Sequence, residues 1–331
     1  MPVGNASDGI GLFAGQLMFS ANFNFQNIDW SHDPVPNEEY DHFGHLNTSL
    51  FLPSLTLGLS DYWNVSYQQA LAVRKMGWGP HEESKHHRTE SSLDDFINAN
   101  GGILGDSKLK FTYLFKNVGM QTGNRIFLGF GISIPSKNVL TSDPFFLQEQ
   151  EESVSGEVSW EEDGHEHRHF ALSDGNYKNI LEFQFFNKRL KNPVFWGIKL
   201  IAEIPFKDSD YNYKAGKTFT LSISSLFKPS KTFRDMNLIG LSGGLFLIHN
   251  GKGYWNGLLD PSSNSTMLIP SIGSIWKMGS NSFSINIQKP LLIKGIGIGS
   301  ENALNNEFDA FEISVGYRYT LDYVIPWLYY K

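Results

Sequence analysis

Histidine gathers in two short polar stretches, and imidazole beside carboxylate is a combination that holds transition-metal ions in proteins. The stretch 81–90 reads HEESKHHRTE, and the stretch 161–170 reads EEDGHEHRHF. Their six histidines are His81, His86, His87, His165, His167 and His169. In an extended segment, every second side chain points the same way about 7 Å further on, so the last three can offer two imidazoles to one ion if the loop bends. The pattern predicts a Zn²⁺ or Cu²⁺ site in a protein that otherwise requires no cofactor.

Two other interpretations of these histidines stay open. Arg88 and Arg168 lie within the stretches and would repel a metal ion. The loops can instead pack together as a metal-free lid, with histidine bonded to Asp and Glu, or remain solvated polar loops. Saturable binding of Zn²⁺ in a calorimetric titration would separate the first interpretation from the other two.

Other reactive chemistry is sparse in this sequence. There is no cysteine, so there is no disulfide and no thiolate ligand. We find no phosphate-binding loop. The net charge of −7 gives no basic balance for nucleic acid. We therefore expect neither an enzyme nor a nucleic-acid partner.

The elements that must position these residues are strands, because side chains alternate in character over long segments. In GLFAGQLMFSANFNF (11–25), the odd positions from Phe13 are mainly apolar and the even positions from Gln16 are mostly polar. Successive side chains of a strand point to opposite faces, so this segment has one apolar and one polar face. Twelve strand-like segments follow one another along the chain. Most exceed the ~5–6 residues of a typical globular strand and reach the ~9–11 residues that cross a bilayer.

The connections between these segments alternate between short and long. The longest lie at about 27–49, 75–106 and 136–177. Outer-membrane barrels have an even number of strands, short periplasmic turns and long extracellular loops. We therefore expect an all-β protein with a single domain over residues 1–331, an antiparallel transmembrane β-barrel of about 12 strands in a bacterial outer membrane. The alternative is a soluble β-sandwich whose apolar face points inward.

Closing such a sheet turns the apolar faces toward lipid and the polar faces toward an enclosed lumen. Seven charged side chains fall on the polar faces: Lys108, Lys110, Glu182, Lys199, Glu203, Glu312 and Arg318. Both signs occur, so these lumen-facing residues form either a ladder of ion pairs that fills the lumen or a charged path for a solute. A twelve-stranded lumen is wider than the filled interior of an eight-stranded barrel and narrower than a porin channel.

Several short segments resemble an outer-membrane family. LGLSDYWNVSYQQAL (57–71) and GGILGDSKLKFTYLF (101–115) resemble features of the "MetA-pathway of phenol degradation"-like family, which is loosely similar to FadL-type barrels. FLGFGISIPSKN (127–138), LSDGNYKNILEFQF (172–185) and SFSINIQKPL (282–291) match its pattern too. The chain departs from the pattern where Ser-Lys-Asn follows the proline of the third segment, and where it ends on DYVIPWLYYK. The resemblance implies an outer-membrane transporter of aromatic compounds, and it transfers no substrate-binding residue.

The sequence thus predicts a passive outer-membrane channel, surrounded by lipid, for a small solute of aromatic or apolar character. The alternative is a barrel that anchors extracellular loops, which bind a metal ion or a protein partner without transport. The opening residues MPVGNASDGIG show neither a basic nor an apolar signal region, so we expect an export signal to precede the printed chain. The sequence does not predict the oligomeric state.

Overall fold

Antiparallel strands form a closed ring in the computed structural model of this chain, which describes residues 11–32, 42–78, 102–118, 122–144, 147, 171–228, 238–295 and 307–329. The strands of the ring are β1 (Gln16–His32), β2 (His42–Gly58), β3 (Trp63–Trp78), β4 (Leu104–Asn117), β5 (Gly123–Ile134), β6 (Tyr177–Lys188), β7 (Phe195–Lys207), β9 (Thr218–Phe227), β10 (Leu238–Asn250), β13 (Thr266–Met278), β14 (Asn281–Gln288), β15 (Leu291–Lys294) and β16 (Glu307–Val324). The remaining elements are β8 (Tyr213–Lys214), β11 (Tyr254–Trp255), β12 (Leu258–Leu259) and the helix α2 (Pro326–Tyr329).

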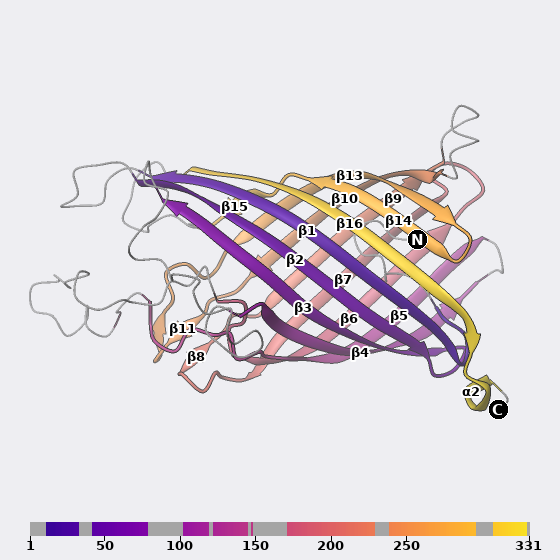
Figure 1. The fold of residues 1–331 in the computed structure, drawn as a ribbon, viewed down its shortest axis with the longest axis horizontal. Helices are drawn as coiled ribbons and strands as arrows, with labels where there is room; N and C mark the ends of the chain where they lie inside the picture. The colour runs from indigo at the N-terminus through magenta and orange to yellow at the C-terminus, as the bar shows by residue number, and fades with distance from the viewer. Residues whose placement is uncertain are drawn as a thin grey trace, which may run out of the picture.

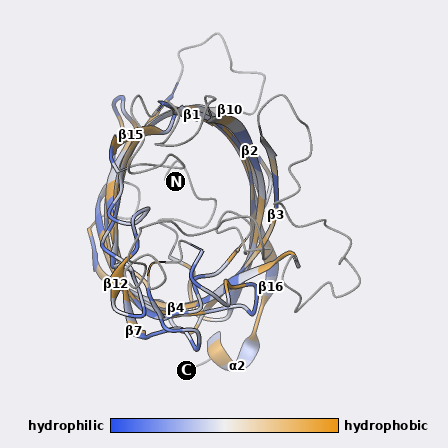
Figure 2. Ribbon diagram, turned by 90° about the vertical axis from the view of Figure 1, so that its left-hand side faces the viewer, coloured by the Kyte–Doolittle hydropathy of each residue, from blue (hydrophilic) through white to orange (hydrophobic). Residues whose placement is uncertain are grey.

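The ring has no open edge, because both ends of the sheet meet. Thirteen strands pair in one sheet, and β10 pairs with β13 to close it. β14 and β15 follow one another along β13, so the ring has twelve strand positions. Pro290 separates these two strands, since proline has no N–H to donate. Figures 1 and 2 show the ring from the side and from one end. The expected closed antiparallel barrel of twelve strands is confirmed.

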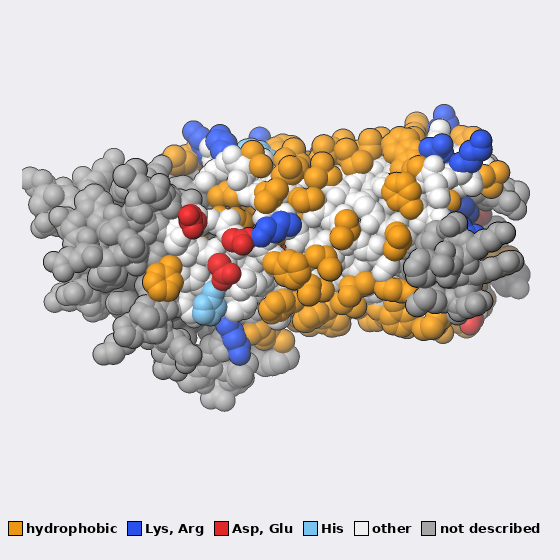
Figure 3. Space-filling model, turned by 90° about the horizontal axis from the view of Figure 1, so that it is seen from above, with side chains coloured by type: hydrophobic (Ala, Val, Ile, Leu, Met, Phe, Trp, Pro, Cys, Tyr) orange, Lys and Arg blue, Asp and Glu red, His pale blue; other side chains and the backbone are white. Residues whose placement is uncertain are grey.

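Side chains of the first strand alternate between the outside and the lumen. Phe19, Phe23 and Phe25 expose 37%, 43% and 37% of their surface on the outside, whereas Ser20 and Asn22 are 1% and 3% exposed. Figure 3 shows apolar side chains over the middle of the wall, with charged side chains toward its two ends. A closed ring satisfies the backbone N–H and C=O groups that lipid cannot, so this wall fits a membrane.

β1 and β2 extend beyond the ends that the alternation predicts. Much of the loop expected over 27–49 is strand, because β1 runs to His32 and β2 begins at His42. Asn27 and Asn47 lie side by side in this extension, with Nδ2 donating to Oδ1 at 3.1 Å. Beyond the apolar belt both faces of a strand can be polar, so the alternation that marks a strand disappears. β3 and β4 extend in the same way.

The two ends of the barrel differ in their connections. One carries short turns, such as residues 59–62 and 279–280, and the other carries the long connections. We call these the short-turn end and the long-loop end; in outer-membrane barrels they face the periplasm and the cell exterior, respectively. The helix α2 follows β16 at the short-turn end (Figure 1). Among the described residues, no helix is long and apolar enough to cross a membrane.

Apolar side chains also occur inside the ring, at the short-turn end. Five of them form a buried cluster that we call the apolar layer: Phe127, Phe186, Phe195, Leu226 and Ile275. The segment before β1 lies against it. A β-carbon built on Gly11 would lie 3.5 Å from the Phe127 ring, and Leu12 is 2% exposed. Inward side chains in a wide aqueous pore would be wet, so this part of the inner wall is packed rather than open to water.

A small sheet of β8, β11 and β12, which we call the cap, belongs to two connections at the long-loop end. Asn256 and Gly257 join β11 to β12 with φ of 47° and 88°. Positive φ at both positions is typical of the type I′ hairpin turn, for which Asn-Gly is a preferred pair. The cap therefore has its own local turn chemistry and lies beside the barrel strands in Figure 1.

Candidate functional site

Ion pairs between strands that are not adjacent in the sheet line one wall of the lumen. Lys108 and Lys110 of β4 pair with Glu203 of β7 and Glu182 of β6, respectively. The distance between Lys110 Nζ and Glu182 Oε2 is 3.0 Å, and the Glu182 side chain is 1% exposed. A buried charge without a partner is strongly destabilising, so these pairs allow the wall to carry charge away from bulk water.

Glu182 is the most enclosed member of these two pairs. Gln184 donates a hydrogen bond to its Oε1, and Lys199 of β7 adds a second positive charge nearby. Gly129 of β5 makes room for it, since a β-carbon there would lie 3.0 Å from the Glu182 Cβ. Lys110 and Lys199 thus both lie near one buried carboxylate.

The wall formed by β14, β16 and β1 is mostly neutral and polar. Gln26 Nε2 donates to Glu312 Oε2 at 3.3 Å, and Arg318 Nη2 donates to Ser282 Oγ at 3.1 Å. Asn22 is 3% exposed on the same side. The seven charged residues of the predicted polar faces are thus divided, with five on β4, β6 and β7 and two on β16. The structure brings together the first group and leaves Glu312 and Arg318 with neutral partners in these bonds.

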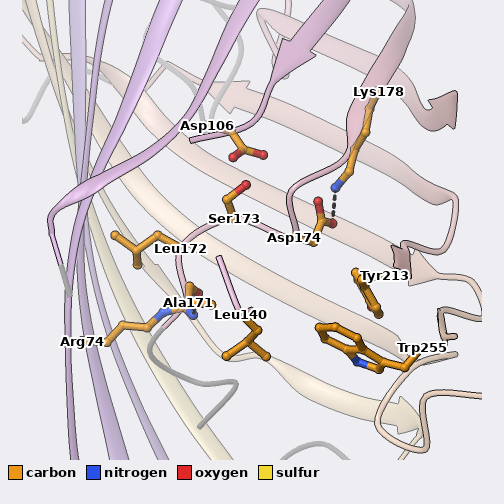
Figure 4. A pocket seen from close by; sticks show the side chains of 10 residues that line it. All are labelled: Arg74, Asp106, Leu140, Ala171, Leu172, Ser173, Asp174, Lys178, Tyr213 and Trp255. Carbon is orange, nitrogen blue, oxygen red and sulfur yellow. Dashed lines mark hydrogen bonds and ion pairs between the residues drawn. The ribbon is translucent and has the colours of Figure 1, made fainter. Parts of the chain in front are cut away.

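A pocket of about 290 Å³ opens where the lumen meets the cap, and Figure 4 shows its side chains. We call it the mouth pocket. Its lining consists of Arg74, Asp106, Leu140, Ala171, Leu172, Ser173, Asp174, Lys178, Tyr213 and Trp255. These residues come from three barrel strands, the cap, and the connection between β5 and β6. Ligand pockets usually measure ~300–1,000 Å³, so this one suits a small molecule.

The charged groups of the mouth pocket balance and are held in place. Lys178 Nζ lies 2.6 Å from Asp174 Oδ2, as the dashed line in Figure 4 marks. Arg74 Nη1 donates to the Ala171 carbonyl at 2.8 Å, and Asp106 Oδ1 accepts the backbone N–H of Ser136, just after β5, at 3.2 Å. Two positive and two negative side chains line the pocket. It therefore offers directed hydrogen bonds rather than a strong field of one sign.

Two aromatic rings form the other side of the mouth pocket. Tyr213 and Trp255 lie with ring centroids 4.7 Å apart and are 8% and 3% exposed. Asn176, which is fully buried, donates to the Tyr213 carbonyl at 3.2 Å and accepts from the Ala215 N–H at 3.1 Å. The Tyr213 hydroxyl donates to Asp260 Oδ2 at 3.1 Å. These bonds fix the rings as a preformed apolar surface.

Below the mouth pocket, the lumen offers free hydrogen-bonding atoms. Ser133 Oγ and Asn64 Oδ1 are buried without a hydrogen-bond partner among the described residues. Ser133 is 1% exposed and lies on β5 between Lys108 and Lys178 of the flanking strands. Buried polar groups are nearly always bonded to protein or to water. These atoms are therefore positions at which water or a solute hydroxyl can bind.

The six histidines of the two polar stretches lie outside the described residues, so the metal site stays a prediction. Elsewhere, His249 Nδ1 shares a hydrogen bond of 2.9 Å with Thr266 Oγ1, and the His45 ring covers Gly77. In the part of the chain that the structure describes, no group of three His, Cys, Asp or Glu side chains is arranged to hold a metal ion.

Sequence reasoning missed the cap and the apolar layer. The Asn-Gly pair at 256–257, between Tyr-Trp and Leu-Leu, is a hairpin signal that could have located β11 and β12. Phe127 and Phe186 stand on the otherwise polar faces of β5 and β6, near the short turns. Large apolar side chains on that face signal that the inner wall is apolar and packed there.

Comparisons with known proteins agree with this architecture. No family profile and no curated protein sequence matches the chain. The COG4313 outer membrane channel from Pseudomonas putida F1 aligns over 96% of this chain and 100% of its own, with a TM-score of 0.55 and 9% identity. A TodX monoaromatic hydrocarbon channel mutant aligns over 96% and 93%, with a TM-score of 0.45 and 8% identity. The expected likeness to outer-membrane channels is confirmed at the level of the fold, and this chain has the fold of an outer-membrane β-barrel.

Proposed function

We propose that the protein is a passive channel for a small solute that combines an aromatic ring with an anionic or hydrogen-bonding group. The mouth pocket carries this proposal, because it sets two fixed aromatic rings opposite polar side chains at the entrance of a polar lumen. Specific small-molecule sites typically pair an apolar surface with a few placed polar groups. The pocket volume of about 290 Å³ limits the solute to a compact molecule.

The lumen below the pocket supports an anionic substituent. A ring held near Trp255 can direct its polar group toward Lys178, which lines the same pocket. Further in, Lys110 and Lys199 both lie near the Glu182 carboxylate, so lysine side chains are present at that level as well. An aromatic carboxylate therefore meets a ring surface first and compensating positive charge second.

The apolar layer makes the proposed passage selective rather than open. Phe127 is 1% exposed, and the segment around Gly11 and Leu12 lies against it, so packed apolar side chains line the lumen at the short-turn end. A solute that leaves by this end passes along these side chains. An aromatic solute contacts such side chains more favourably than a hydrated ion does, because apolar surface is removed from water.

Uptake of 4-hydroxybenzoate into vesicles that contain the full chain tests the proposal. This anion crosses bare lipid slowly, so entry above that of empty vesicles measures the channel. Trp255→Ala should lower the uptake rate about fivefold, which corresponds to ~1 kcal/mol of aromatic contact. Trp276→Ala is the matched control, because Trp276 stands on the outward face of β13 with Ile272, which is 67% exposed.

Heat-modified gel mobility should show both variants folded before the rates are compared. Vesicles with the wild-type chain that take up the anion no faster than empty vesicles would contradict the proposal. Equal rates for the wild type and Trp255→Ala would contradict the role of the mouth pocket.

A further inference from the structure

The chain leaves the barrel wall after its last strand and turns outward. Residues 325–329, which we call the terminal segment, contain α2 and lie outside the ring in both the side view and the end view (Figures 1 and 2). The segment does not extend the strand, because Pro326 has no N–H for a sheet ladder. It also does not enter the lumen, so it takes no part in closing the pore.

The terminal segment is anchored to the seam between the first and last strands. The Ile325 N–H donates to the Gly15 carbonyl at 2.9 Å, and the Leu328 N–H donates to the Ile325 carbonyl at 3.2 Å. Gly15 has φ of 76°, and a β-carbon there would lie 2.9 Å from a Val324 methyl group. Glycine is therefore required at this contact, and the segment has a defined starting point beside β1.

The terminal segment exposes its aromatic side chains. Trp327 is 71% exposed and Tyr329 is 55% exposed, and α2 buries none of its residues. Pro326–Tyr329 contains no Asp, Glu, Lys or Arg. More than half of the surface of each of these two rings is therefore open to the medium around the barrel.

The exposed rings continue an aromatic band on the outer wall. Tyr323, on the same strand end, is 57% exposed, and Tyr62 and Trp63 at a neighbouring short turn are 59% and 36% exposed. Aromatic girdles of this kind mark the level of the lipid headgroups in membrane barrels. Trp and Tyr are favoured there because their rings are apolar and their N–H and O–H groups remain hydrated.

We propose that the terminal segment is an interfacial anchor, which lies among the headgroups of the periplasmic leaflet and holds the β1–β16 seam against the membrane. The partner that this segment contacts is therefore a lipid surface. The position outside the ring, the absence of charge in α2 and the continuity with the aromatic band all fit the plane of the interface. A segment that served a soluble periplasmic partner would have no reason to follow the lipid-facing wall.

Tryptophan fluorescence of the full chain in vesicles tests this proposal. The emission of Trp327 is obtained as the difference between the wild type and Trp327→Phe. Lipids brominated near the headgroup should quench that difference about twofold, and lipids brominated near the chain ends should quench it less. The difference between the wild type and Trp255→Phe is the control, because Trp255 is 3% exposed in the cap at the other end and should not respond.

Quenching of the Trp327 difference by aqueous iodide but by neither brominated lipid would overturn the proposal. A second measurement addresses the seam. Trp327→Asp should lower the thermal unfolding midpoint in vesicles by about 2–5 °C, whereas Trp327→Tyr should preserve it. An unchanged midpoint in Trp327→Asp would refute the anchoring role even if the segment touches lipid.

Discussion

Replacing Phe127 tests whether the apolar layer closes the short-turn end of the lumen. Phe127 is 1% exposed, its ring lies 6.2 Å from that of Phe186, and Gly11 lies against it. Truncating a buried phenylalanine to alanine costs ~3–5 kcal/mol through lost transfer free energy and the remaining cavity. About 0.5–1.5 kcal/mol of this loss is the aromatic pair. We therefore expect Phe127→Ala to lower the free energy of unfolding by ~4 kcal/mol.

The matched control is Phe130→Ala on the same strand. Phe130 is 51% exposed on the outer face and stacks on Phe111 with ring centroids 5.4 Å apart. Only part of its surface is covered by protein, so we expect a smaller loss of ~1–2 kcal/mol. The two variants remove the same atoms from opposite faces of β5. Denaturant unfolding from lipid vesicles measures the two losses.

Permeability separates the two variants more sharply than stability does. Phe127→Ala should make vesicles swell several times faster in a small uncharged sugar, because it opens a cavity in the packed end of the lumen. Phe130→Ala should leave the swelling rate at that of the wild type. Equal swelling in both variants, together with equal losses of stability, would refute the closure of the lumen by the apolar layer.

Three further predictions concern charge, the cap and the histidines. Glu182→Gln should lower the free energy of unfolding by ~3–5 kcal/mol, since it leaves buried lysine charge without its carboxylate, and should shift the reversal potential toward anions. Combining it with Lys110→Gln should restore part of the stability, and simple addition of the two losses would contradict the pairing. Asn176→Ala should cost ~1–3 kcal/mol by leaving backbone groups of the cap unbonded and should speed proteolysis there, whereas Asn179→Ala on the outer wall should not. We also propose that the intact chain binds Zn²⁺ saturably, and that replacing the histidines of 161–170 by alanine weakens it; a titration with no saturable heat would remove the metal site.

The alternation of apolar and polar side chains along single strands predicted the architecture, because it depends only on neighbouring residues in the sequence. Phe19 favours lipid and Ser20 favours a polar lumen, and this difference does not depend on the rest of the chain. Repeated over segments long enough to cross a bilayer, it leaves a closed ring as the arrangement that bonds every backbone group in lipid. The same alternation predicted strands that are too short at β1 and β2, because both faces of these strands become polar where the wall extends beyond the lipid.

The partners of the charged residues could not be predicted from alternation along single strands. Parity places Lys108 and Glu203 on polar faces of their strands, but they lie on β4 and β7, with two strands between them. Which charges meet depends on the register of each strand pair and on side-chain length across the curved wall. Neither quantity can be read from one strand alone.

The mouth pocket was decided entirely by tertiary structure. Tyr213 and Trp255 come from two connections, and Asn176 from a third, and none of these segments alternates. What the sequence determined by itself is the two-sided wall, since each residue's preference for lipid or water acts independently. What only the folded ring decided is the packing of the apolar layer and the chemistry at the mouth of the lumen, because both require side chains distant in the chain to pack against one another.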